Sequence, residues 1–503
     1  MLLDALSAVL DVWVLVAALA GIVIGIVVGA IPGLGPTVAI ALLIPVTFSM
    51  PTVPAITLLL GVYQGAIFGG SISAILMNVP GTPSSAATAI DGFAMARAGK
   101  GARALRVALF SSVTGNVISC IFLILLAEPL ASFALHFGPA EMAMLLLFAL
   151  TTIVLFGAGR PLEAAIMVLV GMLVGVVGLD PIEGTPRFTF GSFELENGFQ
   201  LIPVLVGAFA LAELFYQLFT HTKQTASEAE VVNNTSQAQP FGFIELWRMR
   251  ITLLWSSLIG TFVGILPGVG STVPAFMSYS LARSRSKQPE SFGKGAEEGV
   301  AAPEAANNAV TGGALIPTLA LGIPGDAVTA VVLGAFMLQG LAPGPFLFRD
   351  YGVEVYAIFI VLILSAVPTI ILGLMLFKVA TRVMSVKAEQ LFPVVAILAL
   401  LGAFSVNNSL TDVAVMLGAG ALGFLFRLGG FAIPPLLIGL ILGAPFEQSI
   451  RQTLLASDGN LMAFLDSSIS IGLFVIVLLS LGFACVSAIK AKRGSEKGAS
   501  NHA

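Results

Sequence analysis

The sequence has few charged residues, few histidines and almost no cysteine. Only 10% of its 503 residues are Asp, Glu, Lys or Arg, and the formal net charge is -4, which gives no indication of nucleic-acid binding. Cys120 and Cys485 both lie in apolar runs, which is typical of packing and not of a disulfide or metal framework. His136, His221 and His502 form no catalytic or zinc-binding set, so the sequence does not predict an enzyme.

Apolar sequence is abundant instead. The chain is 57% hydrophobic with a mean hydropathy of +1.01, and apolar runs long enough to cross a bilayer recur from end to end. A G-x-x-x-x-G-K-[ST] motif is absent from the sequence, so ATP is not the expected energy source. These features predict an all-α polytopic membrane protein in contact with the lipid bilayer.

One segment of this apolar sequence occurs twice. Residues 25–38 read GIVVGAIPGLGPTV and residues 260–273 read GTFVGILPGVGSTV, with eight identities in fourteen positions. Each copy places a Pro-Gly-x-Gly break inside an apolar stretch. Paired interruptions in corresponding positions of two halves are the best sequence indication of a secondary transporter's binding site.

The duplication extends beyond this motif. Ala140-Glu141 matches Ala388-Glu389, and Gly207 matches Gly439, with the order of matches preserved. The segment between the copies is rich in Gln, Asn, Ser and Thr, which is linker composition. We predict four parts: a first transmembrane repeat at 1–220, a polar cytoplasmic linker at 221–244, a second transmembrane repeat at 245–466, and an extra C-terminal transmembrane helix with a cytoplasmic tail at 467–503.

Lysine and arginine have opposite bias in corresponding loops of the two copies. After the Pro-Gly-x-Gly motif, residues 46–56 of the first copy contain neither, whereas the second copy has Arg283, Arg285, Lys287 and Lys294. After the next Pro-Gly pair the bias reverses, with four basic residues at 97–106 against Arg349 alone. Because cytoplasmic loops collect Lys and Arg, we predict inverted-topology repeats with a periplasmic N-terminus and a cytoplasmic C-terminus. The alternative is two parallel copies whose loop charges drifted.

The Pro-Gly breaks predict broken or re-entrant helices. Proline removes an amide donor and glycine lets the backbone leave helical geometry, so each break is expected to end one half-helix and begin another. Thr37, Ser271 and Thr272 follow the first pair of breaks as expected caps. Pro80-Gly81 and Pro324-Gly325 repeat the pattern, with helices expected to run to Ala96 and toward Gln339. Four helix starts would supply about two positive charges, which suits an anion.

A structural explanation competes with this functional one. Glycine often serves close helix packing in membranes, and Gly25 with Gly29, or Gly260 with Gly264, satisfies that spacing without any binding role.

These motifs together resemble a known family. The paired breaks, the GTPSSAATAIDG stretch at 81–92 and APEAANNAVTGG at 302–313 are similar to the large membrane subunit of the tripartite tricarboxylate transporters, over nearly the whole chain. The resemblance implies about 12 transmembrane spans in a bacterial inner membrane. It also implies work with a small membrane subunit and a periplasmic substrate-binding protein, in cation-driven uptake of citrate or other carboxylates.

The resemblance also suggests which residues bind substrate and cation. The expected substrate-binding residues surround the breaks or carry neutral polar groups near them: Gly33, Gly35, Thr37, Asn78, Thr82, Ser84, Ser85, Gly268, Gly270, Ser271, Thr272, Asn307 and Asn308. The expected cation-binding residues are Asp326, Thr311 and Glu304, with sodium as the possible coupling ion and no other metal or cofactor.

The two acidic candidates have structural alternatives. Asp326 stands where the first copy has Thr82, and a carboxylate there would repel an anionic substrate, so it is either a helix cap or a cation ligand. Glu304 is either a functional intramembrane carboxylate or a loop-end residue in water. Asp91 is a further expected cap at a helix end.

Two rival functions remain open at this stage. An anion channel would also use inverted repeats with broken helices. A membrane scaffold subunit without its own transport site is harder to reconcile with paired breaks.

Overall fold

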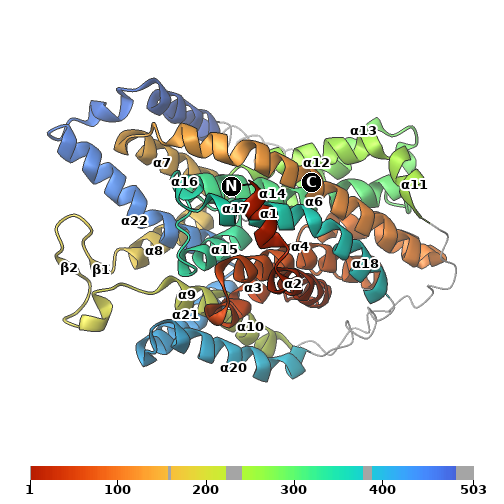
Figure 1. Cartoon of the computed structure of the whole chain (residues 1–503), viewed down its shortest axis with the longest axis horizontal. Helices are drawn as coiled ribbons and strands as arrows, with labels where there is room; N and C mark the ends of the chain where they lie inside the picture. The colour runs from red at the N-terminus through yellow and green to blue at the C-terminus, as the bar shows by residue number, and fades with distance from the viewer. Residues whose placement is uncertain (1, 157–159, 222–240, 378–387, 483–503) are drawn as a thin grey trace, which may run out of the picture. The chain divides into compact units, whose positions relative to one another are not determined.

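The computed structural model describes all residues except 1, 157–159, 222–240, 378–387 and 483–503, and it is dominated by helices (Figure 1). The described residues form two compact units. Unit 1 consists of residues 1–135 and 199–433, and unit 2 of residues 136–198 and 434–503. Each unit therefore contains parts of both predicted repeats.

Unit 1 holds most of the helices. In chain order they are α1 (Leu2–Val9), α2 (Val12–Ala30), α3 (Pro36–Leu43), η1 (Ile44–Ser49), α4 (Thr52–Met77), α5 (Ser85–Met95), η2 (Ala96–Lys100), α6 (Gly101–Ala134), α9 (Leu201–Leu205), η4 (Val206–Leu211), α10 (Ala212–His221), α11 (Phe243–Arg248), α12 (Arg250–Gly264), α13 (Thr272–Arg285), η5 (Pro289–Ser291), α14 (Glu297–Leu321), α15 (Ala327–Leu338), α16 (Leu347–Asp350), α17 (Gly352–Leu364), α18 (Ala366–Leu376), α20 (Ala388–Asn407) and α21 (Leu410–Leu428).

Unit 2 combines helices with a short hairpin, namely α7 (Pro139–Phe156), α8 (Pro161–Gly175), β1 (Gly178–Leu179), β2 (Pro186–Arg187), η3 (Phe193–Leu195), α22 (Ile433–Ala456) and η6 (Leu461–Leu465). β1 and β2 pair antiparallel. Asp180 in this hairpin bonds to Arg187 and, at 2.6 Å, to Arg451 of α22. The backbone N–H of Glu183, together with Arg451, holds the pKa of the Asp180 carboxyl below its usual range.

Small residues allow the central helices of unit 1 to approach closely. α2 lies against α4, and α12 against α14 (Figure 1). A Cβ added at Gly25 would lie 2.5 Å from the Val62 carbonyl oxygen, and one at Gly260 would lie 2.1 Å from that of Ala306. The packing explanation for these glycines is therefore confirmed.

Each unit contains a close contact between a glycine of one repeat and a carbonyl oxygen of the other. In unit 1 this glycine belongs to the first repeat, and in unit 2 it belongs to the second. A Cβ at Gly207 would lie 2.2 Å from the Met416 carbonyl oxygen, and one at the matching Gly439 would lie 2.3 Å from that of Val168. Met416 follows Val168 by 248 residues, the interval that also separates Ala140 from Ala388. The structure thus repeats, in packing, the duplication seen in the sequence. Whether the copies are inverted stays a prediction.

The structure confirms a polytopic helical membrane protein. Seven helices among the described residues are long and apolar enough to cross a membrane, or eight if α17 and α18, bent by 42° at Ser365, form one span. Several further apolar helices are shorter, at 10–17 residues, and the predicted C-terminal helix is one of them where it is described, at 468–482. The expected count of 12 stays a prediction.

All four predicted breaks interrupt helices. α2 ends at Ala30 and α3 begins at Pro36, while α12 ends at Gly264 and α13 begins at Thr272. Arg285, at the far end of α13, lines the same pocket as Arg248, just before α12. The chain therefore reverses at the second break, and α12 with α13 forms a helical hairpin; whether it is re-entrant stays a prediction. The helices after the other two Pro-Gly pairs are α5 and α15, near the predicted bounds.

Candidate functional site

The glycines of the first pair of breaks have conformations that other residues rarely adopt. Gly33, Gly268 and Gly270 have φ of 89°, 78° and 66°. A Cβ at Gly33 would also lie 2.6 Å from the Gln217 side-chain nitrogen. These positions need glycine for the turn itself, whatever else they do.

The caps expected at these breaks differ in outcome. The prediction for Thr37 is wrong, because Gly35 is the N-cap of α3 and Pro36 its first residue, which puts the half-exposed Thr37 at the second helical position. Ser271 is the N-cap of α13, as predicted, but the prediction for Thr272 is wrong, because it is the first helical residue. Neither N-cap makes a side-chain capping bond.

The start of α5 is a buried cluster of hydroxyl groups. Thr82, Ser84 and Ser85 are at most 6% exposed. The Ser85 hydroxyl donates to the Thr82 carbonyl at 2.7 Å, and the Thr82 and Ser84 hydroxyls lie 3.1 Å apart. The structure thus brings three predicted substrate-binding residues together at one helix N-terminus, where backbone N–H groups point outward.

The start of α15 is built around a carboxylate instead. Asp326 is the N-cap, and its Oδ1 accepts from the Thr329 backbone N–H at 2.7 Å. Its Oδ2 accepts from the Tyr63 hydroxyl of α4 at 2.7 Å. Asp326 is therefore a helix cap, which was one of the two alternatives for this residue. This turn also meets the second break, between α12 and α13, since the Gly268 N–H donates to the Gly325 carbonyl at 2.8 Å.

Glu304 of α14 is fully buried among hydroxyl groups from three other helices. Ser71 of α4 donates to its Oε1 at 2.5 Å, Thr88 of α5 donates to the same oxygen, and Ser112 of α6 donates to Oε2 at 2.8 Å. The alternative of a loop-end carboxylate in water is therefore wrong. The carboxylate and three hydroxyls form a set of oxygen atoms with no nitrogen or sulfur.

Next to Glu304, α14 carries polar groups without partners. Asn307 and Thr311 are 0% exposed, and among the described residues neither the Asn307 amide atoms nor the Thr311 hydroxyl has a hydrogen-bond partner. Asn308 differs, since its amide donates to the Glu304 carbonyl of its own helix at 3.1 Å. An unsatisfied buried polar group costs roughly 1–3 kcal/mol, so these atoms need an explanation.

The relative direction of α5 and α14 indicates where the Asn307 and Thr311 side chains lie. Asp91, near the end of α5, abuts Gly299, and Thr88, one turn earlier, reaches Glu304. The two helices therefore run in opposite directions. Asn307 and Thr311 follow Glu304 by three and seven residues on the same helix face, toward the start of α5. We infer that their polar atoms lie on the side of α14 that approaches the hydroxyl cluster.

The two buried carboxylates contact α4 at different points along its axis. Asp326 contacts this helix at Tyr63 and Glu304 contacts it at Ser71. Eight helical residues span about 12 Å along the axis. A single ion cannot be coordinated by both carboxylates in this structure.

Asn78 lies at the end of α4, before the turn that leads to α5. It is exposed and is the left-handed C-cap of α4, with φ of 55°. A left-handed asparagine is a common helix end, and the substrate role of Asn78 stays a prediction.

Four residues of the polar clusters were absent from the sequence predictions: Tyr63, Ser71, Thr88 and Ser112. Thr88 lies inside the 81–92 motif, which was the only sequence signal for any of them. Asp91 was predicted as a cap at a helix end, but it lies inside α5 and its carboxylate binds the loop segment that precedes α14. Its Oδ1 accepts from the N–H groups of Gly293, Gly295 and Ala296, just before α14, and its Oδ2 from the Tyr279 hydroxyl.

Within the part of the chain that the structure describes, no three His, Cys, Asp or Glu side chains gather as a metal site would require. The oxygen set at Glu304 is of the type that hard cations accept.

The sequence matches a known family over most of its length. Residues 15–438 match the tripartite tricarboxylate transporter TctA family. A protein of Agrobacterium vitis, described as an uncharacterized 52.8 kDa protein in the TAR-I ttuC' 3' region, is 38% identical over 97% of this chain and 96% of its own length. Another, described as an uncharacterized protein in the TAR-II ttuC' 3' region of the same organism, is 36% identical over 46% of this chain and 97% of its own length. No solved structure matches the chain.

Proposed function

Because the chain belongs to the tripartite tricarboxylate transporter TctA family, we propose that it is the translocating large subunit of a binding-protein-dependent secondary transporter. Its substrates would be tricarboxylates such as citrate, or related carboxylates. A sodium or proton gradient would drive uptake. The observation that carries this proposal is the pair of unpartnered, fully buried side chains Asn307 and Thr311 beside broken helices.

The substrate would bind between the helix starts and α14. The hydroxyl cluster of α5 and the Ser271 N-cap of α13 offer donors to carboxylate oxygens without a buried Lys or Arg. The amide of Asn307 and the hydroxyl of Thr311 would gain partners when the substrate or its cation is present. Ligand binding would then remove the penalty that these groups incur in the free protein.

Of the three candidate cation ligands, two are carboxylates, and Glu304 is the better of these. Its carboxylate and the hydroxyls of Ser71, Thr88 and Ser112 come from four helices, so a bound cation would link those helices. Sodium accepts such oxygen ligands, and its charge would offset part of the substrate's negative charge. Asp326 has a capping role already, which leaves it less available for an ion.

Membership of the family supports a proposal for the partners and the location. We propose that the chain works with a small membrane subunit and a periplasmic substrate-binding protein in a bacterial inner membrane, its N-terminus periplasmic and its C-terminus cytoplasmic. The loop charges described above support this orientation.

Reconstituted uptake tests the function. The complex of the chain with both partners in proteoliposomes is expected to accumulate radiolabelled citrate, or a related carboxylate, under an inward sodium or proton gradient. Preloading with unlabelled substrate should accelerate entry by exchange. A flux without such trans-stimulation would indicate an anion channel, and no flux that depends on this chain would indicate a scaffold.

Two substitutions test the site. Ser84→Ala and Thr37→Val should each weaken uptake while the protein still inserts in the membrane. Unchanged uptake in both variants would remove the proposed substrate site. Uptake that ignored a sodium gradient and followed only pH would remove the sodium role of Glu304 and Asp326.

A further inference from the structure

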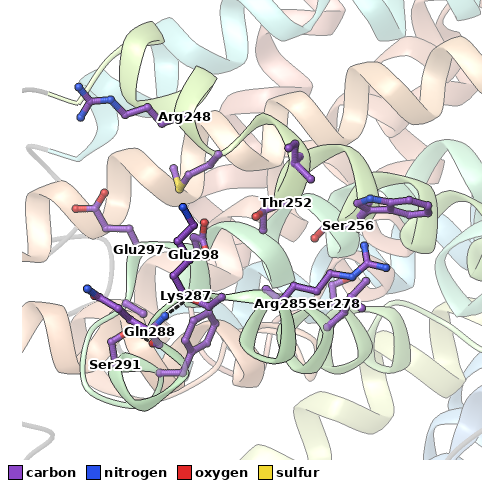
Figure 2. Close-up of a pocket in the computed structure, with 18 of the residues that line it drawn as sticks. Arg248, Thr252, Ser256, Ser278, Arg285, Lys287, Gln288, Ser291, Glu297 and Glu298 are labelled. Atoms are coloured by element: carbon purple, nitrogen blue, oxygen red, sulfur yellow. Dashed lines mark hydrogen bonds between the residues drawn. The ribbon is translucent and has the colours of Figure 1, made fainter.

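A cavity lies at the open end of the α12–α13 hairpin, away from the breaks. It has a volume of about 690 Å³ and is lined by the start of α12, the end of α13 and the segment that leads to α14. Three basic side chains line it: Arg248, Arg285 and Lys287 (Figure 2). In Figure 2 Lys287 lies near the centre of the group, whereas the guanidinium of Arg248 extends outward.

The cavity also contains a buried polar atom without a partner. The Ser278 hydroxyl is 1% exposed, lines the cavity, and has no hydrogen-bond partner among the described residues. Further hydroxyl and amide groups line the cavity beside it, those of Thr252, Ser256, Ser286, Gln288 and Ser291. This cavity therefore offers hydrogen-bond donors together with positive charge, as an anionic group requires.

Two carboxylates line the same cavity, but the negative charge of one of them is balanced by an ion pair. Glu297 forms an ion pair with Arg103 of α6, with a nitrogen to oxygen distance of 2.5 Å. Glu298 is the other acidic residue of the lining. Three basic side chains against one uncompensated carboxylate leave the cavity positive.

An apolar groove continues from this cavity. It also lies between α12 and α13 and shares Leu281 with the cavity, and its walls include Ile259, Phe276 and Met277. Phe276 and Met277 are 40% and 47% exposed, so the groove opens sideways. In a membrane protein the surrounding medium at such a groove is lipid acyl chain.

An aromatic residue marks the level where the two regions meet. The guanidinium of Arg285 stacks over the Trp255 ring at 5.1 Å from its centroid, and Trp255 is 46% exposed. Tryptophan at the lipid face and nearby Arg and Lys are typical of the membrane interface, and an excess of Lys and Arg is typical of its cytoplasmic side. A bilayer whose interface lies at Trp255 would place the cavity among lipid headgroups and the groove among acyl chains.

We propose that this cavity and groove bind one anionic glycerophospholipid from the cytoplasmic leaflet. Its phosphate and headgroup interact with Arg285, Lys287 and the Ser278 hydroxyl, and one acyl chain lies along Phe276 and Met277. Basic pockets between membrane helices commonly bind anionic lipid headgroups in this way. The lipid would fill the open hairpin and support α13, whose other end carries the second break.

Lipid binding to the full-length chain in detergent tests the proposal. Native mass spectrometry would compare dioleoyl phosphatidylglycerol with dioleoyl phosphatidylcholine, and the anionic lipid is expected to bind more tightly. The double variant Arg285→Gln/Lys287→Gln should lose at least tenfold in affinity for phosphatidylglycerol, since each basic residue near the surface contributes roughly fivefold.

The matched control is Arg283→Gln/Lys294→Gln. It removes the same charge from the same two segments, and both residues are exposed and absent from the cavity lining. The control is expected to bind phosphatidylglycerol within twofold of the parent chain. An equal loss in both double variants would show a general surface attraction and would overturn the proposal.

A third comparison distinguishes a lipid from a soluble anion. Phe276→Ser in the groove should weaken binding of the dioleoyl lipid but leave binding of its dihexanoyl analogue unchanged. If glycerol 3-phosphate or citrate binds the cavity as tightly as the lipid, and Phe276→Ser has no effect, the cavity is a soluble-anion site and the lipid proposal is wrong. None of these measurements depends on transport.

Discussion

Glu304 and Asp326 are both buried carboxylates of the second repeat, yet different parts of the chain hold them. Asp326 is bonded by its own helix, through the Thr329 N–H, and by one hydroxyl from α4. Glu304 is bonded by hydroxyls from three other helices. A carboxylate that caps its own helix has a local role already. The Glu304 carboxylate instead accepts only from hydroxyls of other helices, so it holds several helices together. Those hydroxyls can rotate and offer their oxygen lone pairs to a cation.

The largest effect is expected at Glu304. Glu304→Gln keeps the size of the side chain but removes the charge that a cation would need. Uptake by the reconstituted complex should fall by roughly a hundredfold, because intramembrane carboxylates of this kind serve function by default. Uptake within twofold of the parent, at matched protein level, would show that Glu304 only holds the helices together.

The effect expected at Asp91 is smaller than at Glu304 and larger than at Asp326. The Asp91 carboxylate accepts hydrogen bonds from the backbone of a segment that is distant in the sequence. Asp91→Ala removes the acceptor for three N–H groups at 293–296 and for Tyr279. Losing charged hydrogen bonds of about 1.5–3 kcal/mol each should release this segment. Trypsin cleavage at Lys287 and Lys294 is expected to rise about tenfold or more, and the conservative Tyr279→Phe variant should show a smaller rise. An unchanged digestion pattern would contradict this role.

Asp326 is expected to show a smaller, purely structural effect. Asp326→Ala should lower the free energy of unfolding by about 1–2 kcal/mol through loss of the N-cap. Asp326→Asn should restore most of that stability, because asparagine caps helices as well as aspartate does. The measurement is thermal unfolding of the purified chain, with uptake recorded in parallel. If Asp326→Asn were stable but inactive, Asp326 would join Glu304 as a cation ligand.

The smallest effect is expected at Asn78. Asn78→Gly keeps the left-handed backbone at the end of α4, since glycine adopts this conformation without strain. Uptake and thermal stability should both stay within experimental error of the parent. A clear loss of uptake at normal stability would restore the substrate role that the sequence suggested for this residue.

The breaks could be predicted from sequence because their cause is local. Proline and glycine act on their own backbone, so helix ends near residues 30, 81, 264 and 325 follow from the residues there. The capping of α15 could likewise be predicted, because Asp326 directly precedes its helix in the sequence.

The polar cluster around Glu304 could not be predicted in the same way. Ser71, Ser112 and Glu304 are separated by long stretches of chain, and serine is common in membrane helices for packing. Only the approach of α4, α5 and α6 to α14 makes them neighbours. The Asp91 contact with residues 293–296 is of the same kind, because its partners are backbone groups that carry no sequence signal.

The exchange of helices between the two repeats has a consequence for biogenesis. Gly207 packs against Met416 in unit 1, and Val168 packs against Gly439 in unit 2. Ribosomes add about 5–20 residues per second, so segments near residues 168 and 207 wait ten seconds or more for their partners. The first half therefore cannot complete its tertiary structure alone, and assembly of both units must follow insertion of the last helices.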